Sequence, residues 1–326
     1  MTDRKDDDLA PWAPFVDAHR RLPVAAPVEE DTSSSLPAGA GSRSGAGVTP
    51  MMAPRIRRPM PADLRARVVT GVGVAVGAAL VLRAGPLAVA WLAAAVVVAA
   101  VLELYAASRA QGHRPAILLG VIASGSLVLG AYDRGPEAFP LILALSVVFG
   151  LVWYVIDTAR NRPAVDLSVT LLGVVYVGGL GAFGGLLVGL DDGVGMVVGL
   201  ALCAVAHDVG AYFVGARYGR RRIAPRLSPN KSIEGLAAGM AASLVAGGLL
   251  AARVAPWDLK TGLALGALVA VLAPLGDLCE SMVKRDLAVK DLGTVLPGHG
   301  GVLDRFDTIL FALPGVYYLA RGLGLG

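Results

Sequence analysis

The sequence predicts an all-α, polytopic membrane protein. Of its 326 residues, 55% are hydrophobic and 17% are charged, whereas soluble domains carry about 25% charged residues. The apolar residues gather into runs of roughly 17 to 25 residues, the length that an α-helix needs to cross a bilayer. A membrane β-barrel would instead show shorter segments in which apolar and polar residues alternate. Composition and run length together therefore predict several spanning helices.

The first 62 residues differ in kind from the rest of the chain. They begin with acidic residues, continue through a stretch rich in Pro, Ser and Gly, and end on a basic segment around Arg57. Such a composition buries too little apolar surface to offset the entropy lost on ordering. We therefore expect a disordered cytoplasmic tail over residues 1–62 and a transmembrane domain over residues 63–326. Because no charged segment with a short apolar core opens the chain, we expect the first spanning helix, and no cleaved signal peptide, to anchor it.

The apolar runs and the breaks between them predict about nine transmembrane helices. Pro86, Pro115 and Pro140 lie near helix starts, where the missing N–H of proline costs little. Pro274 lies inside the eighth run instead, where we expect it to bend the helix. The predicted spans are residues 66–84, 86–106, 115–132, 138–157, 167–189, 193–216, 233–254, 260–289 and 304–324.

The distribution of Lys and Arg predicts which side of the membrane each loop faces. Cytoplasmic loops of membrane proteins carry an excess of these residues. With the tail in the cytoplasm, the inner loops hold dense clusters at residues 217–231 and 284–290. This asymmetry predicts an N-in, C-out protein of the inner (plasma) membrane, with both clusters facing the cytoplasm. The outer loops hold only Arg83, Arg134, Arg253, Lys260 and Arg321.

The positive charge of the chain does not indicate a nucleic-acid partner. The formal net charge is only +4, and the cations lie mostly at helix ends, where they suit topology and anionic lipid. No interleaving of aromatic and basic residues suggests RNA or DNA. Cys203 and Cys279 lie inside apolar runs without the spacing of a metal site, so we interpret them as small buried hydrophobes.

Residues 281–307 and the helix before them carry the densest group of ionisable side chains in the apolar part of the chain. If the eighth span stays helical past Pro274, then Asp277, Ser281, Lys284 and Arg285 share one helix face. A charge at the centre of a spanning helix costs roughly 2.5 to 3.5 kcal/mol, so such a group indicates a functional site. A carboxylate at the buried end and cations nearer the surface suit a metal ion and a phosphate. A salt-bridged helix end is the simpler alternative.

A glycine-rich loop follows, from Leu292 to Val302. Its backbone can approach a ligand closely, and successive free N–H groups form a cradle for an anion, although an ordinary turn fits the same residues. After the loop, Asp304 and Asp307 open the ninth span. Together with Asp277, these carboxylates are predicted to hold a hard divalent cation such as Mg²⁺, with water and substrate phosphates completing its shell.

A second polar stretch covers residues 208–235. Ser228 and Lys231 come shortly before the next helix start, where hydroxyl and ammonium donors suit a polyanion or a nucleobase. His207 beside Asp208 suggests a proton relay, but adjacent helix residues point about 100° apart. A buried histidine with a partner on another helix is the simpler interpretation.

Both polar stretches carry the motif of a known family. Over its C-terminal part the chain resembles the CTP:phosphatidate cytidylyltransferases, also called CDP-diglyceride synthases. Cys279, Ser232 and Ile233 depart from the commonest residues of that family. The upstream motifs are met by Asp208, Ala211, Tyr212, Gly215, Gly219, Ser228, Pro229, Lys231, Glu234, Gly235, Gly276, Asp277 and Glu280. The downstream signature is met by Ser281, Lys284, Arg285, Lys290, Asp291, Gly293, Leu296, Pro297, His299, Gly300, Gly301, Asp304, Arg305 and Asp307.

The resemblance implies a membrane enzyme that transfers CMP from CTP to phosphatidic acid with Mg²⁺, giving CDP-diacylglycerol and pyrophosphate. A second cation and a homodimer stay open. The implied metal ligands are Asp277, Asp304 and Asp307. The implied catalytic residues are Asp277, Lys284, Arg285, Asp291, Asp304 and Asp307. The implied substrate-binding residues are Ser228, Lys231, Ser281, Lys290, His299, Gly300, Gly301 and Arg305.

Two other functions are kept as alternatives. An ion-coupled transporter is suggested by His207, Asp208 and Asp277 inside apolar runs, but such a protein places its charges near the midplane between related halves. Here the charges cluster toward one face, and no inverted repeat is evident. A CTP-dependent lipid or polyprenol kinase would use a similar membrane site. It differs in its product, because a kinase releases CDP and a cytidylyltransferase releases pyrophosphate.

Overall fold

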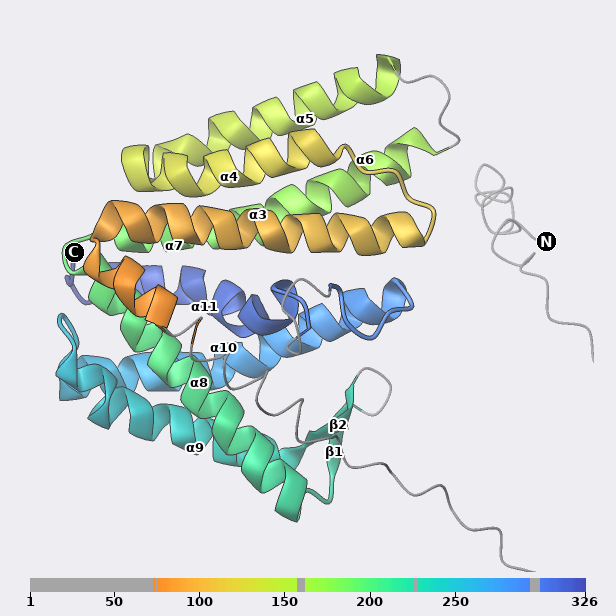
Figure 1. Cartoon of the computed structure of the whole chain (residues 1–326). Coiled ribbons are helices and arrows are strands. Elements are labelled where there is room, and N and C mark those ends of the chain that lie inside the picture. The colour runs from red at the N-terminus through yellow and green to blue at the C-terminus, as the bar shows by residue number, and fades with distance from the viewer. Residues whose placement is uncertain (1–72, 74–75, 157–161, 225–227, 294–299) are drawn as a thin grey trace, which may run out of the picture. The chain divides into compact units, whose positions relative to one another are not determined.

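The computed structural model describes residues 73, 76–156, 162–224, 228–293 and 300–326. The predicted tail, residues 1–62, lies outside this part, as do residues 66–72, 74 and 75 of the first predicted span, residues 66–84. Within the described part, the regular elements are helices apart from one short hairpin (Figure 1). The predicted all-α class is therefore confirmed for these residues.

Helices occupy the positions of the second to the ninth predicted span. The hairpin of β1 (Arg222–Ala224) and β2 (Ser228–Ser232) is antiparallel and was not predicted. The α-helices are α3 (Pro86–Ala110), α4 (Ile117–Arg134), α5 (Ala138–Ile156), α6 (Pro163–Leu172), α7 (Leu180–Val188), α8 (Gly193–Tyr218), α9 (Ile233–Leu249), α10 (Leu259–Asp286) and α11 (Leu303–Gly322). The shorter helical elements are η2 (Gly135–Glu137), the π-helix η3 (Gly173–Gly179) and η4 (Ala251–Arg253).

Six helical segments of the described part are long and apolar enough to cross a membrane. One of them, Ile117–Ile156, contains both α4 and α5, which are joined by η2 and fold back on each other in Figure 1. Another, Pro163–Val188, runs from α6 through η3 to α7. Helix α11 is not among the six, because its first two turns carry three charged residues. The number of nine spans stays a prediction.

Two large clusters of buried apolar side chains hold most of the helices together, and a third, of Val89, Ala90 and Val188, joins α3 to α7. The larger cluster joins α7, α8, α10 and α11 through residues such as Leu187, Leu200, Leu265 and Val316. The second cluster surrounds α3 and groups Val101 and Leu104 with side chains of α4 and α11. Both clusters include residues of α11: the second cluster holds its first half through Leu303, and the larger cluster holds its second half through Val316. Helix α10 continues through Pro274 as one helix.

Helices α9 and α10 pack so closely that glycine is required at their contact. A β-carbon at Gly247 would collide with the carbonyl oxygen of Gly262, and one at Gly262 would collide with the carbonyl oxygen of Gly247. Beside them, the Ser243 hydroxyl donates to the Gly266 carbonyl oxygen at 3.0 Å. Small residues of this kind let helix backbones approach each other inside a membrane.

A capping box fixes the start of α10. The Asp258 carboxylate accepts the backbone N–H of Thr261 at 2.7 Å, and the Thr261 hydroxyl oxygen accepts the backbone N–H of Asp258 at 2.8 Å. The backbone N–H of Thr261 is the main cause that lowers the pKa of Asp258, and the Thr261 hydroxyl, which donates to the same carboxylate at 2.8 Å, is the next. The helix therefore begins at a defined residue, which sets the rotational position of the ionisable side chains at its other end.

We expect the change Gly247→Ala to lower the thermal midpoint of the purified protein. A β-carbon there must displace the α10 backbone, and overpacking of this kind costs about 1 to 3 kcal/mol. Unfolding in detergent, followed by circular dichroism, measures the shift. The matched control is Gly77→Ala, because a β-carbon at Gly77 meets no atom within 4 Å. Equal midpoints for the two variants would contradict the close α9–α10 contact.

Candidate active site

The last three turns of α10 carry a buried ion pair that reaches across to α11. The Lys284 ammonium nitrogen lies 2.6 Å from Glu280 Oε2 and 3.2 Å from Asp304 Oδ1. The side chains of Glu280 and Lys284 are 3% and 17% exposed. Buried charges are tolerated where they are paired and hydrogen-bonded. This cation therefore compensates one carboxylate on its own helix and another on the first turn of α11.

Asp304 also holds the glycine-rich loop. Its Oδ2 accepts the backbone N–H groups of Leu292 and Gly301, each at 3.1 Å. These two donors lie at opposite ends of the loop, whose residues 294–299 are outside the described part. Gly300 has a φ of +87°, which a residue with a side chain rarely adopts. The loop is thus closed by one carboxylate and needs glycine at its second end.

A second group of charges lies next to the first. The Lys231 ammonium group forms an ion pair with the Asp277 carboxylate, and the carboxyl groups of Asp277 and Asp307 lie within hydrogen-bonding reach of each other. Asp307 is 5% exposed. Two adjacent carboxylates repel unless a proton or a cation lies between them. The arrangement therefore favours the binding of a cation.

The β-hairpin places Lys231 next to these carboxylates. Lys231 is the penultimate residue of β2 and lies two positions before α9 begins. The Glu234 carboxylate accepts the backbone N–H of Arg220 at 3.0 Å, and the Ser232 hydroxyl oxygen accepts that of Gly235 at 3.1 Å. Ser232, one of the residues that depart from the commonest pattern of the family, therefore acts as the N-terminal cap of α9.

The structure brings five of the predicted site residues together and separates others. The cluster contains Lys231, Asp277, Lys284, Asp304 and Asp307, with Gly301 bound to Asp304. His299 lies outside the described residues, and Gly300 is half-buried in the loop. Ser228 and Ser281 are half-buried, while Arg285, Lys290, Asp291 and Arg305 are exposed.

The predicted metal ligands do not converge as a set of three. Among the described residues, no group of three or more His, Cys, Asp or Glu side chains is placed to hold a metal ion. Asp277 and Asp307 are adjacent, whereas Asp304 contacts Lys284. His207, for which a proton relay with Asp208 was the less favoured interpretation, has its Nδ1 at 3.4 Å from Asp208 Oδ1. His207 is buried, but its Nε2 has no described partner, so the predicted partner on another helix is not found.

Sequence reasoning did not identify Glu103 of α3 as a site residue. The Glu103 side chain is buried, and its Oε2 accepts the backbone N–H of Leu303 at 2.9 Å. A β-carbon at Gly293 would collide with the Glu103 carboxylate, and one at Gly301 would lie 2.8 Å from Glu103 Oε2. A lone acid inside an apolar run was the available signal, because such residues are rare in spanning helices.

Tyr176 of the π-helix η3 was also not identified. Its hydroxyl is buried and has no hydrogen-bond partner among the described residues. The ring lies close enough to interact electrostatically with Glu280 and Asp307. π-Helical turns often occur at functional sites. No sequence signal marked this residue, because π-helical turns have no simple spacing of apolar residues.

We expect Glu103→Ala to loosen the start of α11. Leu303 would keep a buried N–H without an acceptor, which costs about 1 to 3 kcal/mol. Hydrogen–deuterium exchange of the peptide over residues 300–306 should become faster. Glu103→Gln retains a carbonyl acceptor and should change exchange less. Glu137→Ala, at an exposed glutamate of η2, is the control, and unchanged exchange in Glu103→Ala would contradict the role given to Glu103.

Comparison with known proteins agrees with the motifs. A sequence model of the cytidylyltransferase family matches residues 65–323. A phosphatidate cytidylyltransferase of Mycobacterium bovis is 32% identical over 264 residues, which cover 76% of this chain and 85% of the relative. One of Bacillus subtilis is 32% identical over 264 residues, covering 79% of this chain and 97% of the relative. The phosphatidate cytidylyltransferase of Mycobacterium leprae gives a shorter match, which is 43% identical and covers 44% of this chain and 46% of the relative. The chain is a member of the cytidylyltransferase family.

Proposed function

We propose that the cluster of Lys231, Asp277, Lys284, Asp304 and Asp307 is the active centre of a phosphatidate cytidylyltransferase. The reaction transfers CMP from CTP to phosphatidic acid and releases pyrophosphate. The observation that carries this proposal is the meeting of two lysines, from β2 and α10, with carboxylates of α10 and α11. The relatives of Mycobacterium bovis and Bacillus subtilis are named for this activity and match most of the chain.

The chemistry explains why the centre needs both kinds of charge. The phosphate monoester of phosphatidic acid attacks the α-phosphorus of CTP, so two polyanions have to approach each other. Positive groups then neutralise the repulsion and align an in-line displacement, and little acid–base chemistry is needed. Lys231 and Lys284 are placed to hold phosphate oxygens. Asp304 positions Lys284 and the loop, so it keeps this cation directed at the substrates.

The residues of the centre fit Mg²⁺ as the family cofactor. Mg²⁺ binds one or two carboxylates and completes its shell with water and substrate phosphates, so it does not need three protein ligands. Asp277 and Asp307 supply two adjacent carboxylates, and the buried Glu280 Oε1 has no hydrogen-bond partner among the described residues. We assign Asp277 as the first ligand, with Asp307 or Asp304 as the second. When bound, the ion would supply charge neutralisation for the phosphates.

The position of the centre suits one substrate that enters from water and another that enters from the lipid bilayer. Figure 1 shows the C-terminal ends of α3 and α10 and the N-terminal ends of α4 and α11 at the same side of the helices. The Lys and Arg distribution supports a cytoplasmic position for this side. We therefore propose an N-in protein of the plasma membrane in which CTP enters from the cytoplasm and phosphatidic acid from the adjoining leaflet.

We expect Asp277→Asn to lower turnover on the order of 100-fold, because a neutral amide neither binds Mg²⁺ well nor pairs with Lys231. The purified protein is incubated with labelled CTP, phosphatidic acid and Mg²⁺, and the products are identified. Pyrophosphate and CDP-diacylglycerol from the unchanged protein support the proposal, whereas release of CDP would identify a kinase.

The control for this change is Asp133→Asn, which should keep full turnover. Asp133 is an exposed aspartate at the C-terminal end of α4, away from the centre. Asp304→Asn and Asp307→Asn, compared over a range of Mg²⁺ concentrations, identify the second ligand by a raised Mg²⁺ requirement. Normal turnover of Asp277→Asn at every Mg²⁺ concentration would exclude Asp277 from the centre.

We also expect a chain that begins near Pro61 to keep its turnover. The composition of residues 1–62 indicates disorder, and all motif residues lie after them. Turnover and membrane insertion are compared for the full chain and the shortened chain. A shortened chain that inserts correctly and has lost activity would show that the tail takes part in the reaction.

A further inference from the structure

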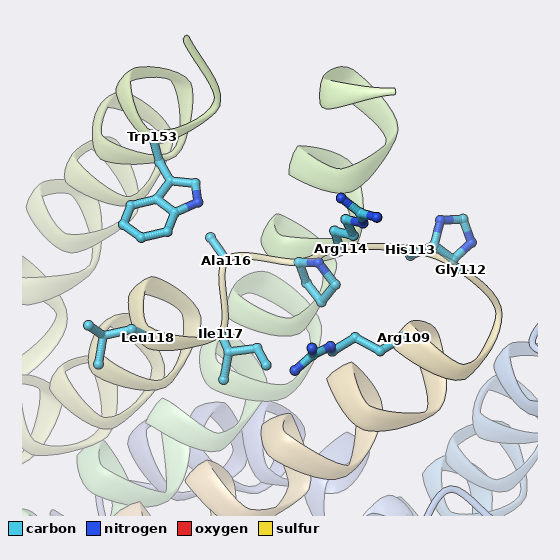
Figure 2. Close-up of a pocket in the computed structure, with 9 residues that line it drawn as sticks. Arg109, Gly112, His113, Arg114, Ala116, Ile117, Leu118 and Trp153 are labelled. Carbon is cyan, nitrogen blue, oxygen red and sulfur yellow. The ribbon is translucent and has the colours of Figure 1, made fainter. Parts of the chain in front are cut away.

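A pocket of about 690 Å³ lies at the ends of α3, α4 and α5, apart from the candidate active site. Arg109 at the end of α3, His113 and Arg114 of the following loop, and Trp153 of α5 line it (Figure 2). The remaining lining residues belong to the same loop and to the first turn of α4. No residue of α10, α11 or β2 takes part, so this pocket is a separate feature.

The lining has a cationic half and an apolar half. Arg109 and Arg114 give the cationic half its positive charge, with His113 beside them, and the lining residues within the described part include no acid. In Figure 2 the Arg109 side chain extends beneath the loop toward Ile117. Leu118 and Trp153 form the apolar half, and they are 67% and 48% exposed. An anion that carries a hydrocarbon tail matches both halves, whereas a soluble anion matches only the first.

Buried partners hold the loop of the pocket in place. The Arg114 backbone N–H donates to Asp166 Oδ1 at 2.8 Å, and its carbonyl oxygen accepts the Tyr154 hydroxyl at 3.0 Å. The Ala116 backbone N–H donates to Thr170 Oγ1 at 2.9 Å. Asp166, Tyr154 and Thr170 are all buried. The residues of the cationic half therefore belong to a backbone segment that is already ordered. This order lowers the entropy cost of binding an anion there.

We propose that this pocket binds the phosphate of an anionic phospholipid headgroup, with the acyl chains lying along Leu118 and Trp153. The pocket is at the helix ends that the cation distribution assigns to the cytoplasmic leaflet, where anionic lipids are enriched. Tryptophan is favoured at this depth, because its ring has one apolar and one polar part. Basic pockets between helices at this face of a membrane bind phospholipid headgroups.

The test uses phosphatidylglycerol, which is not the acceptor in the reaction proposed above because it lacks a phosphate monoester. The full chain is purified in detergent, and bound lipid is counted by native mass spectrometry over a range of lipid concentrations. An arginine near an anionic lipid contributes about 1 kcal/mol, or about fivefold in affinity. Arg109→Gln should therefore weaken the tightest phosphatidylglycerol site about fivefold, and Trp153→Ala should weaken it as well.

The matched control is Arg134→Gln, which removes an exposed arginine at the other end of α4 and should leave this site unchanged. An equal loss in both arginine variants would show general charge attraction and overturn the proposal. Equal retention of phosphatidylcholine would do the same. Displacement of the lipid by an equal concentration of inorganic phosphate would show an anion site that does not recognise lipid. Turnover of phosphatidic acid, measured in parallel, reports separately on the proposed reaction.

Discussion

The candidate active site depends on the contact of Lys284 with Glu280 and Asp304. One ammonium group, 2.6 Å from the first carboxylate and 3.2 Å from the second, joins the end of α10 to the start of α11. Removing one partner of a buried ion pair leaves an uncompensated charge and costs about 3 to 5 kcal/mol. Asp304 in turn binds both ends of the glycine-rich loop. The position of the loop therefore follows from the same contact.

The described centre has more acidic than basic groups. Glu280 and Asp304 share Lys284, whereas Lys231 pairs with Asp277, whose carboxyl group lies next to that of Asp307. Buried carboxylates that share too little positive charge attract a further cation. An acidic centre can thus bind two polyanionic substrates. Its carboxylates hold and orient the lysines and a bound cation, and these positive groups contact the phosphates. Tyr176, whose hydroxyl is buried beside the acids, belongs to the same electrostatic environment.

Local sequence patterns predicted the helices and much of the centre. Apolar run length placed the helices from α3 to α11, and helical spacing placed Asp277 and Lys284 on one face. Residue type and position also singled out Lys231 and the acids of α11, and the resemblance implied their roles. Glu103 was missed as a site residue, because its bond to the Leu303 N–H joins positions 200 residues apart. The hairpin was missed as well, because strands of three and five residues are stable only through their tertiary context.

The sequence by itself determined the class of protein, the positions of the helices, the family and the residue types of its candidate site. These follow from the length of apolar runs, from charges that are costly in lipid, and from a motif of fixed spacing. Only the tertiary structure decided which charges pair. It placed Asp307 against Asp277 and Asp304 against Lys284, and it put Glu103 under the loop. The physical reason is that electrostatic pairing depends on distance in space, and helix packing, not sequence separation, sets that distance.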